Sequence, residues 1–257
     1  MGIDLFILTR SIKPELENIQ GVRRFVTDYS VASILEGIEG SVALVSNILD
    51  YPRPLSTFTR ASSKPREAVR RASASSLPKE QTELERTLLS TGWFIDYVVP
   101  RRNRYLNDGG DAIPVNVAGQ SMLIPGTGNE PLNMTAVRDV TRAVGKLLFA
   151  QSWERYTYIS GGKATWNEVV PLMKETYPQM SVKYRSLAEY IENIVANPDP
   201  NGEERIISEY GIFSASRAGD LPIDKVAAHR EKHFSGIKFR GPRELLAEVE
   251  KDLEVIV

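Results

Sequence analysis

Three short apolar runs near the start of the chain constrain its fold more than any other feature. They are Ile3–Leu8, Val22–Val26 and Ser41–Val45, and each is rich in Ile, Val, Leu or Phe. Runs of this length without strict alternation are typical of strands that are buried on both faces of a parallel sheet. The sequence therefore predicts three neighbouring parallel strands within the first 50 residues.

A helical segment separates the second run from the third. Residues 31–38 carry apolar side chains at helical spacing, after Ser30 as a possible cap and before Gly40 as a possible end. Strand, helix and strand in this order predict a βαβ unit with a right-handed crossover.

The rest of the chain predicts further short strands and helices. Helices are expected at Lys79–Thr91, Thr135–Ala150, Trp166–Tyr177, Leu187–Val195, Glu203–Ser208 and Arg243–Val255, with Thr135 and Thr165 as N-caps. Strands are expected at Trp93–Val99, Met122–Ile124, Tyr156–Ile159 and Val182–Tyr184.

These elements predict an α/β protein in two parts. Residues 1–150 are expected to form a Rossmann-like parallel sheet, and residues 151–257 a smaller, helix-rich substrate lobe interleaved with it. Residues 51–78 are rich in Ser, Arg and Pro without an apolar period, so we interpret them as a low-complexity insert.

Composition excludes several classes of function. The 257 residues include no Cys, which excludes disulfides, a thiol nucleophile and Cys-based metal sites. The net charge of −1 gives no overall attraction to nucleic acid or anionic lipid, and no apolar run approaches the roughly 18 residues of a membrane span. We expect a cytoplasmic protein whose partner is a small-molecule substrate; the oligomeric state stays open.

Arg10 and Ser11 follow the first apolar run, with Thr9 between them and its last residue. Ligands of doubly wound folds bind at the carboxyl ends of the strands, where an arginine can pair with the 2′-phosphate of NADP and a serine can add a hydroxyl contact. An ordinary surface arginine explains the same position equally well.

The ends of the other two runs carry weaker candidates. Asp28 and Tyr29 can flank an adenine ring, although a helix cap is the favoured interpretation of Asp28 in isolation. Ser46 and Asn47 can face the inner ribose of the cofactor, by position alone. Lys79 can orient a ribose or donate a proton, but a surface lysine is the commoner case.

Phosphate loops and metal sites have no clear signature. No Gly-x-Gly-x-x-Gly or P-loop motif occurs, and Gly126 and Gly128 are expected to form a turn. His229 and His233 have a spacing that permits metal binding on a helix, but their charged neighbours favour a solvated helix face, so no metal is predicted.

Several stretches together resemble fungal NmrA-like proteins, which are atypical short-chain dehydrogenases related to isoflavone reductases. The stretches are Leu8–Ser11, Gly21-Val22 with Thr27–Ser30, Leu35–Gly40, Val42–Ser46, Gly92–Tyr97, Ile124–Gly128, Thr135–Val144 with Asp139-Val140, Trp153 and Thr165–Glu168. They cover most of residues 3–195.

The resemblance implies an NADP-binding domain and a reductase of small aromatic or polyketide-like substrates in secondary metabolism. It implies Arg10 and Ser11 at the 2′-phosphate, Asp28 and Tyr29 near the adenine, and Ser46 and Asn47 along the cofactor. Alternatives are a regulator that senses the dinucleotide without turnover and an inactive truncated paralogue.

The chain departs from the family pattern in two places. The first strand of the family, its glycine-rich loop and the following helix are expected before Ile3, and residues 51–92 carry a low-complexity run where the catalytic-lysine helix is expected. The resemblance implies Lys79 as the counterpart of that lysine. Without the first strand, we expect a rearranged or weakened sheet.

Overall fold

The computed structural model describes residues 5–9, 19–26, 33, 36, 43–46, 57–61, 84–199 and 202–257. The chain divides into two compact units. The first comprises residues 1–49, 54–88 and 152–155, and the second comprises residues 50–53, 89–151 and 156–257. The expected boundary near residue 150 stays a prediction.

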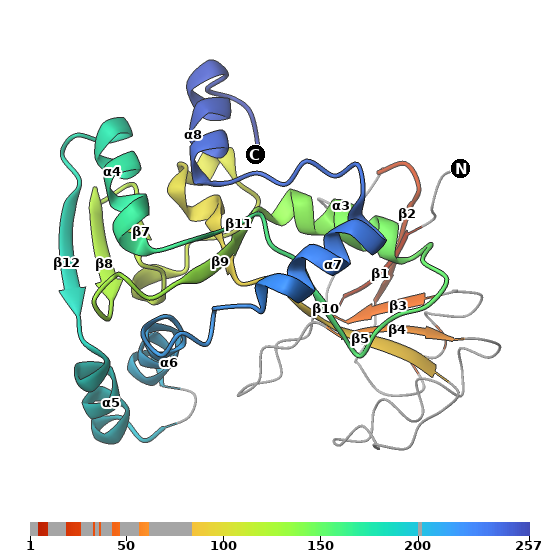
Figure 1. The fold of residues 1–257 in the computed structure, drawn as a ribbon, viewed down its shortest axis with the longest axis horizontal. Helices are drawn as coiled ribbons and strands as arrows, with labels where there is room; N and C mark the ends of the chain where they lie inside the picture. The colour runs from red at the N-terminus through yellow and green to blue at the C-terminus, as the bar shows by residue number, and fades with distance from the viewer. Residues whose placement is uncertain are drawn as a thin grey trace. The chain divides into compact units, whose positions relative to one another are not determined.

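Two parallel strands open the first unit (Figure 1). β1 (Leu5–Thr9) pairs with β2 (Val22–Val26) in a register that runs from Leu5 opposite Val22 to Thr9 opposite Val26. This confirms the first two expected strands and their parallel pairing. Of the helix expected at residues 31–38, Ser33 and Glu36 are helical and the other residues lie outside the described part.

The third expected strand is present, but its expected parallel pairing is wrong. β3 (Ala43–Ser46) pairs antiparallel with β4 (Thr57–Ala61), which lies within the supposed low-complexity insert. β4 in turn pairs antiparallel with the start of β5 (Leu84–Ser90). Within the described residues, β1 and β2 form a separate two-stranded sheet, which agrees with the expected rearrangement.

β5 replaces the helix expected at Lys79–Thr91, and residues 79–83 lie outside the described part. The leucines at positions 84, 88 and 89 fit one face of a helix, which misled the prediction. The observed burial alternates instead, because Thr87 and Leu89 are buried while Leu88 and Ser90 are half-buried. This is the period of a strand, and the hydrogen bonds to β4 decide between the two structures.

Two mixed sheets form the frame of the second unit. In the first, β9 (Leu132–Thr135) pairs parallel with β6 (Trp93–Phe94) and antiparallel with β11 (Gly162–Ala164). In the second, β8 (Ser121–Pro125) pairs parallel with β12 (Ser181–Arg185) and antiparallel with β7 (Val115–Asn116). The strand expected at Trp93–Val99 therefore ends at Phe94. β10 (Tyr156–Tyr158) confirms another expected strand, and Ile159 N after it donates to Ser90 O.

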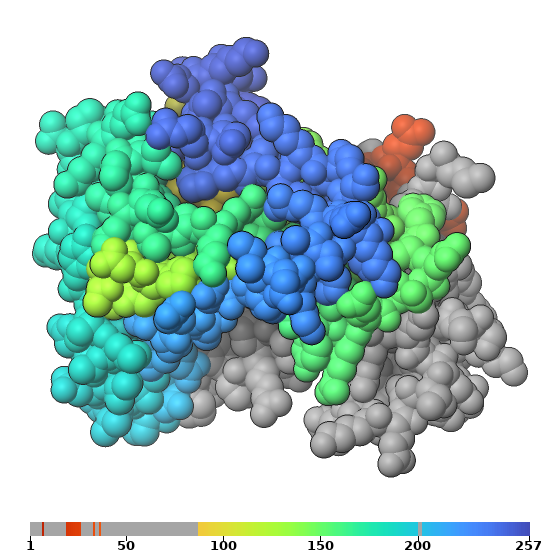
Figure 2. All heavy atoms as spheres, in the orientation of Figure 1, coloured from red at the N-terminus to blue at the C-terminus, as the bar shows by residue number. Residues whose placement is uncertain are grey.

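The described residues also form 3-10 helices and α-helices. The 3-10 helices are η2 (Ile95–Val98), η3 (Arg101–Asn103) and η4 (Gly110–Ala112). The α-helices are α3 (Val137–Leu147), α4 (Trp166–Thr176), α5 (Leu187–Ala196), α6 (Glu203–Ala215), α7 (Ile223–Phe234) and α8 (Pro242–Lys251). α7 and α8 form part of the visible surface in Figure 2. The expected α/β class with a helix-rich C-terminal part is confirmed.

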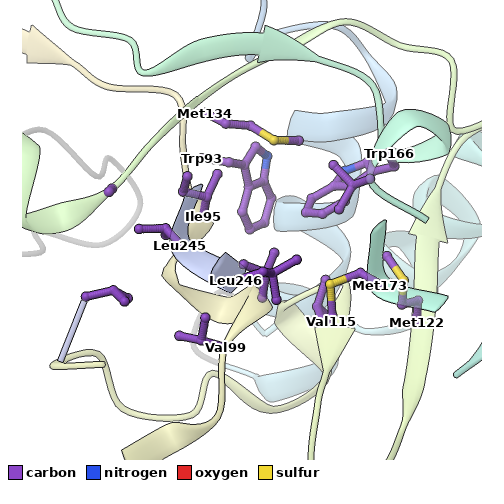
Figure 3. Close-up of a cluster of buried hydrophobic side chains, with 14 of the residues drawn as sticks. Trp93, Ile95, Val99, Val115, Met122, Met134, Trp166, Met173, Leu245 and Leu246 are labelled. Carbon is purple, nitrogen blue, oxygen red and sulfur yellow. The ribbon is translucent and has the colours of Figure 1, made fainter. Parts of the chain in front are cut away.

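The hydrophobic core of the second unit is built from its strands together with η2, α4 and α8. It includes Trp93, Ile95, Val99, Val115, Met122, Met134, Trp166, Met173, Leu245 and Leu246 (Figure 3). Burial of a side chain of this size stabilises a fold by roughly 1.5–3 kcal/mol. None of the described helices is long and apolar enough to cross a membrane.

Candidate functional site

The two parallel strands of the first unit, β1 and β2, end at the same edge of their sheet. Thr9 and Val26, their last residues, are register partners, so both carboxyl ends lie at one edge. Arg10 and Ser11 follow Thr9 directly in the sequence, and Asp28 and Tyr29 follow Val26 within three residues. All four lie outside the described residues.

The other expected site residues are described only in part. Ser46 is the last residue of β3 and stands opposite Thr57, but only its backbone is described. Asn47 and Lys79 lie outside the described residues. The cofactor-binding and catalytic assignments of all these residues stay predictions.

In the second unit, the junction of β5 and β6 requires glycine. Gly92 has φ +66°, and a Cβ on it would lie 2.0 Å from the carbonyl oxygen of Asn133 on β9. Thr135 Oγ1 donates to the carbonyl oxygen of Thr91, the residue before Gly92, at 2.6 Å and holds it in place. The Gly92-Trp93 pair therefore reflects a close approach of two backbones, which only glycine permits.

Asn133 is a buried polar residue that the sequence analysis missed. Its Nδ2 donates to Ser160 Oγ at 2.8 Å, and its Oδ1 accepts from Leu221 N at 2.7 Å. Its backbone N–H donates to Gly219 O at 2.9 Å. Asn133 thus ties β9 to the turn before β11 and to the segment between α6 and α7. The only signal in the sequence is an amide within the run Leu132–Thr135, all of which is buried.

Asp96 caps helix α3 from another part of the chain. Thr135 was expected to cap this helix, but Thr135 belongs to β9 and the N-cap is Ala136, which has no polar side chain. The carboxylate Oδ2 of Asp96 accepts from Val137 N at 3.0 Å instead. Burial raises the pKa of Asp96, and the hydrogen bond from Val137 offsets part of that rise.

Asp139 anchors the segment that leads into α8. Its carboxylate accepts from Arg240 N at 2.8 Å and from Arg240 Nε at 3.2 Å, and it also pairs with Arg142. Arg240 reaches Glu248 on α8 at 2.8 Å. Although burial lowers the pKa of Arg240, its contacts with Asp139 and Glu248 leave it above the ordinary value. Asp96 and Asp139, the acidic residues of the stretches that resemble the NmrA-like family, thus form their hydrogen bonds and ion pairs within this chain.

His229 lies in a buried position, so the expected solvated helix face is wrong for this residue. Only 4% of it is exposed, its Nδ1 accepts from Tyr158 N at 2.9 Å, and its ring stacks on Tyr158 with centroids 5.6 Å apart. Neighbours on β10 rather than charges along α7 decide its burial. Among the described residues, no group of three or more His, Asp and Glu side chains is placed to hold a metal ion.

The expected turn at Gly126 and Gly128 is confirmed. Both glycines have positive φ, at +71° and +78°. The carboxylate of Glu130 accepts from Thr127 N at 3.1 Å, and Asn167 N on α4 donates to Gly128 O. A carboxylate of this chain therefore occupies the N–H group of Thr127, which a phosphate cradle would offer to its ligand.

Comparison with known proteins decides the family. The chain is 37% identical over 286 residues to oxidoreductase swnR of Metarhizium robertsii, with 100% of this chain and 93% of the relative covered. It is 35% identical over 280 residues to oxidoreductase swnR of Arthroderma benhamiae, with 97% and 91% covered. The chain belongs to the family of fungal swnR oxidoreductases. The first alignment runs over more positions than the 257 residues of this chain, so the relative carries additional residues inside the aligned region.

Other comparisons add less. No family model matches the chain, so the NmrA-like relationship stays a prediction. A nucleoside-diphosphate-sugar epimerase from Staphylococcus aureus aligns over 62% of this chain and 51% of its own, with 14% identity and a TM-score of 0.44. This likeness is too weak to decide the fold or the activity.

Proposed function

We propose that this chain is an NADP-dependent oxidoreductase, a reductase of a small organic substrate of the aromatic or polyketide-like kind in secondary metabolism. Membership of the swnR oxidoreductase family supports the reaction class. The level ends of β1 and β2 are the structural observation that supports the cofactor site.

The residues after these strands fit the cofactor chemically. Parallel α/β sheets bind ligands at the carboxyl ends of their strands. Arg10, one residue after β1, carries the planar guanidinium that matches a phosphate group. We assign Arg10 and Ser11 to the 2′-phosphate, and Asp28 and Tyr29 to the adenine. A bound nicotinamide supplies the hydride.

The remaining assignments follow the order of the strands in the sequence. Ser46 and Asn47 follow the third apolar run and are assigned to the ribose next to the pyrophosphate. Lys79 is the candidate proton donor to the reduced substrate. These assignments rest on the family resemblance and on position in the sequence.

Titration with NADPH and NADH tests the proposal. Arg10→Ala is expected to weaken NADPH binding by roughly 10- to 100-fold, the worth of one charge-assisted contact. NADH lacks the 2′-phosphate, so its binding should change little. Arg102→Ala, at an exposed arginine of η3, is the matched control and should leave both affinities unchanged.

Two results would contradict the proposal. One is the absence of NADPH binding up to millimolar concentration. The other is an equal loss of NADPH and NADH affinity in the Arg10 variant, which would show that the arginine does not recognise the phosphate.

A second candidate function is a dinucleotide sensor without turnover, or an inactive paralogue. It is favoured by one observation, which is that the sequence contains no glycine-rich phosphate loop. NADPH binding without oxidation in the presence of a panel of aromatic ketones would favour the sensor. Steady NADPH consumption with one of them would favour the reductase.

A further inference from the structure

Helix α5 of the second unit presents a row of apolar side chains to solvent. Val195 is 76% exposed, and Ile191, one turn earlier, is 48% exposed. Residues four positions apart are neighbours on a helix surface, and the half-buried Leu187 extends the row by one more turn. Single exposed apolar residues are normal in proteins, but a contiguous row of them is typical of an interaction surface.

A different face of α5 holds the helix in the fold. That face packs on α6, which lies beside α5 in Figure 1. Tyr190 on α5 is only 3% exposed, and a Cβ on Gly211 of α6 would come 2.3 Å from its ring. Asn193 Nδ2 on α5 also donates to Ser208 Oγ on α6 at 2.8 Å. Because these contacts position the helix, the exposed row is available to a partner.

Opposite charges lie toward the two ends of this row. Lys183 on β12, before the helix, is exposed. The acid of the first turn, Glu189, is bound locally, because its carboxylate accepts from Ser186 N and Ser186 Oγ at 2.7 Å each. Past the middle of the helix, the exposed acids are Glu192, Asp199 and Glu203. The helix dipole adds a partial positive charge at the first end and a partial negative charge at the second.

A surface with a basic end, an apolar middle and an acidic end is complementary to a second copy of itself. A two-fold axis brings the same patch of two copies together. If the two α5 helices run antiparallel, the apolar rows meet and each basic end faces the acidic end of the other copy. A parallel pair would place like charges together, and a partner of one charge sign would leave one end unmatched.

We propose that two copies of this chain form a two-fold dimer through antiparallel α5 helices. The apolar row of Leu187, Ile191 and Val195 is the centre of the interface, and Lys183 of each copy faces Asp199 of the other. The exposed Ala188 is small, so it lets the two helices approach closely. This surface belongs to the second unit alone and goes beyond the proposed oxidoreductase function, since it needs neither NADP nor the residues after β1 and β2.

Sedimentation velocity of the full chain between about 1 and 100 µM tests the dimer. A short row of apolar side chains makes a small interface, so we expect a dissociation constant within this range. Val195→Glu is expected to weaken the dimer at least about 10-fold, because it places a carboxylate in the apolar middle. Ile223→Glu, at a 68% exposed isoleucine of α7, is the matched control and should leave the dimer unchanged.

Exchanging the charges at the two ends tests the antiparallel arrangement. Lys183→Glu and Asp199→Lys should each weaken self-association about 10-fold, because each puts like charges at both ends of the dimer. An equal mixture of the two variants should associate as the wild type does, because both contacts again join opposite charges. Far-UV circular dichroism shows that each variant is folded.

Cross-linking of the wild type needs no variant. A carbodiimide joins a lysine directly to a carboxylate, and a mixture of ¹⁴N- and ¹⁵N-labelled chains identifies the links between copies. We expect such a link from the peptide with Lys183 to the peptide with Asp199. A wild type that is monomeric at about 100 µM, a dimer that Val195→Glu leaves intact, a variant mixture without recovery, or links only between other surfaces would overturn the proposal. NADPH titration is a separate measurement, so the two proposals can fail independently.

Discussion

At the scale of single residues, the acidic positions of the family motif act on the fold. Asp96 accepts from Val137 N and supplies the cap that Ala136 cannot provide. Asp139 binds Arg240 and Arg142. These carboxylates lie within sequence stretches that resemble a reductase family, yet their observed partners belong to this chain. Asp96 and Asp139 are therefore evidence for the fold of the second unit rather than for a catalytic role.

Asp96 leads to a prediction about pH. Burial raises its pKa in the folded protein above the value in the unfolded chain, so the folded state holds the proton more strongly. The contribution of Asp96 to stability is therefore complete below the unfolded pKa and is lost as the pH rises through the folded pKa. The wild type should lose stability relative to Asp96→Asn as the pH rises from about 4 toward neutral.

Urea unfolding of both proteins across this pH range measures that difference. Asp111→Asn, at an exposed acid of η4, is the control and should follow the wild type. A difference between wild type and Asp96→Asn that stays constant with pH would contradict the account of Asp96.

Asn133 leads to a prediction about stability. Asn133→Ala removes the acceptor of Leu221 N and the donor to Ser160 Oγ in a buried place. We expect a loss of roughly 2–5 kcal/mol in the free energy of unfolding, because two polar groups lose their partners. Asn129→Ala, at an exposed amide of the turn before β9, should cost less than about 1 kcal/mol. Equal losses in the two variants, measured by urea unfolding, would contradict the role of Asn133.

At the scale of elements, two glycines make a matched test of backbone requirements. Gly92 has φ +66° and no room for a Cβ, whereas Gly145 lies within helix α3 with nothing within 4 Å of a Cβ. Gly92→Ala should destabilise the protein severely, because both the backbone angle and the contact with Asn133 forbid it. Gly145→Ala should stabilise it by roughly 0.5–1 kcal/mol through helix propensity.

Thermal unfolding of both glycine variants checks this prediction. A folded Gly92→Ala protein with the melting temperature of the wild type would show that the β5–β6 junction is not as tight as observed. A destabilised Gly145→Ala protein would contradict the open surroundings of that position.

The sequence predicted an element wherever its local pattern and its surroundings agreed. Helix α4 was predicted with its cap, because Thr165 and Glu168 form a capping box that depends only on neighbours in the chain. β5 was mistaken for a helix because its leucines fit one face of a helix and the deciding partner, β4, lies in a stretch without an apolar period. The cap of α3 was missed because Asp96 is 41 positions from Val137 along the chain.

Polar residues of the second unit were predicted poorly for the same reason. Asn133 and His229 receive their partners from segments 27 to 88 positions away, which no local pattern reveals. The ends of β1 and β2 were accessible to sequence reasoning, because an apolar run followed within two residues by a charged residue is a local signal.

At the scale of the whole molecule, two separate findings support the cofactor assignment. One is membership of the swnR family, and the other is the parallel pairing of β1 and β2. The swnR relatives cover nearly the whole chain and are named oxidoreductases. The first unit supplies a parallel pair of strands that end at one edge, and the second contains the hydrophobic core cluster of the described residues. On this account the residues after β1 and β2 bind NADP.

Hydrogen exchange with and without NADPH, read by mass spectrometry, tests the central claim most directly. Backbone N–H groups that become protected by a ligand exchange more slowly, and peptides report where this happens. The account predicts slower exchange in the peptides that contain Arg10 and Ser11 and in those that contain Asp28 and Tyr29. Protection confined to residues 89–257, or unchanged exchange throughout at saturating NADPH, would contradict it.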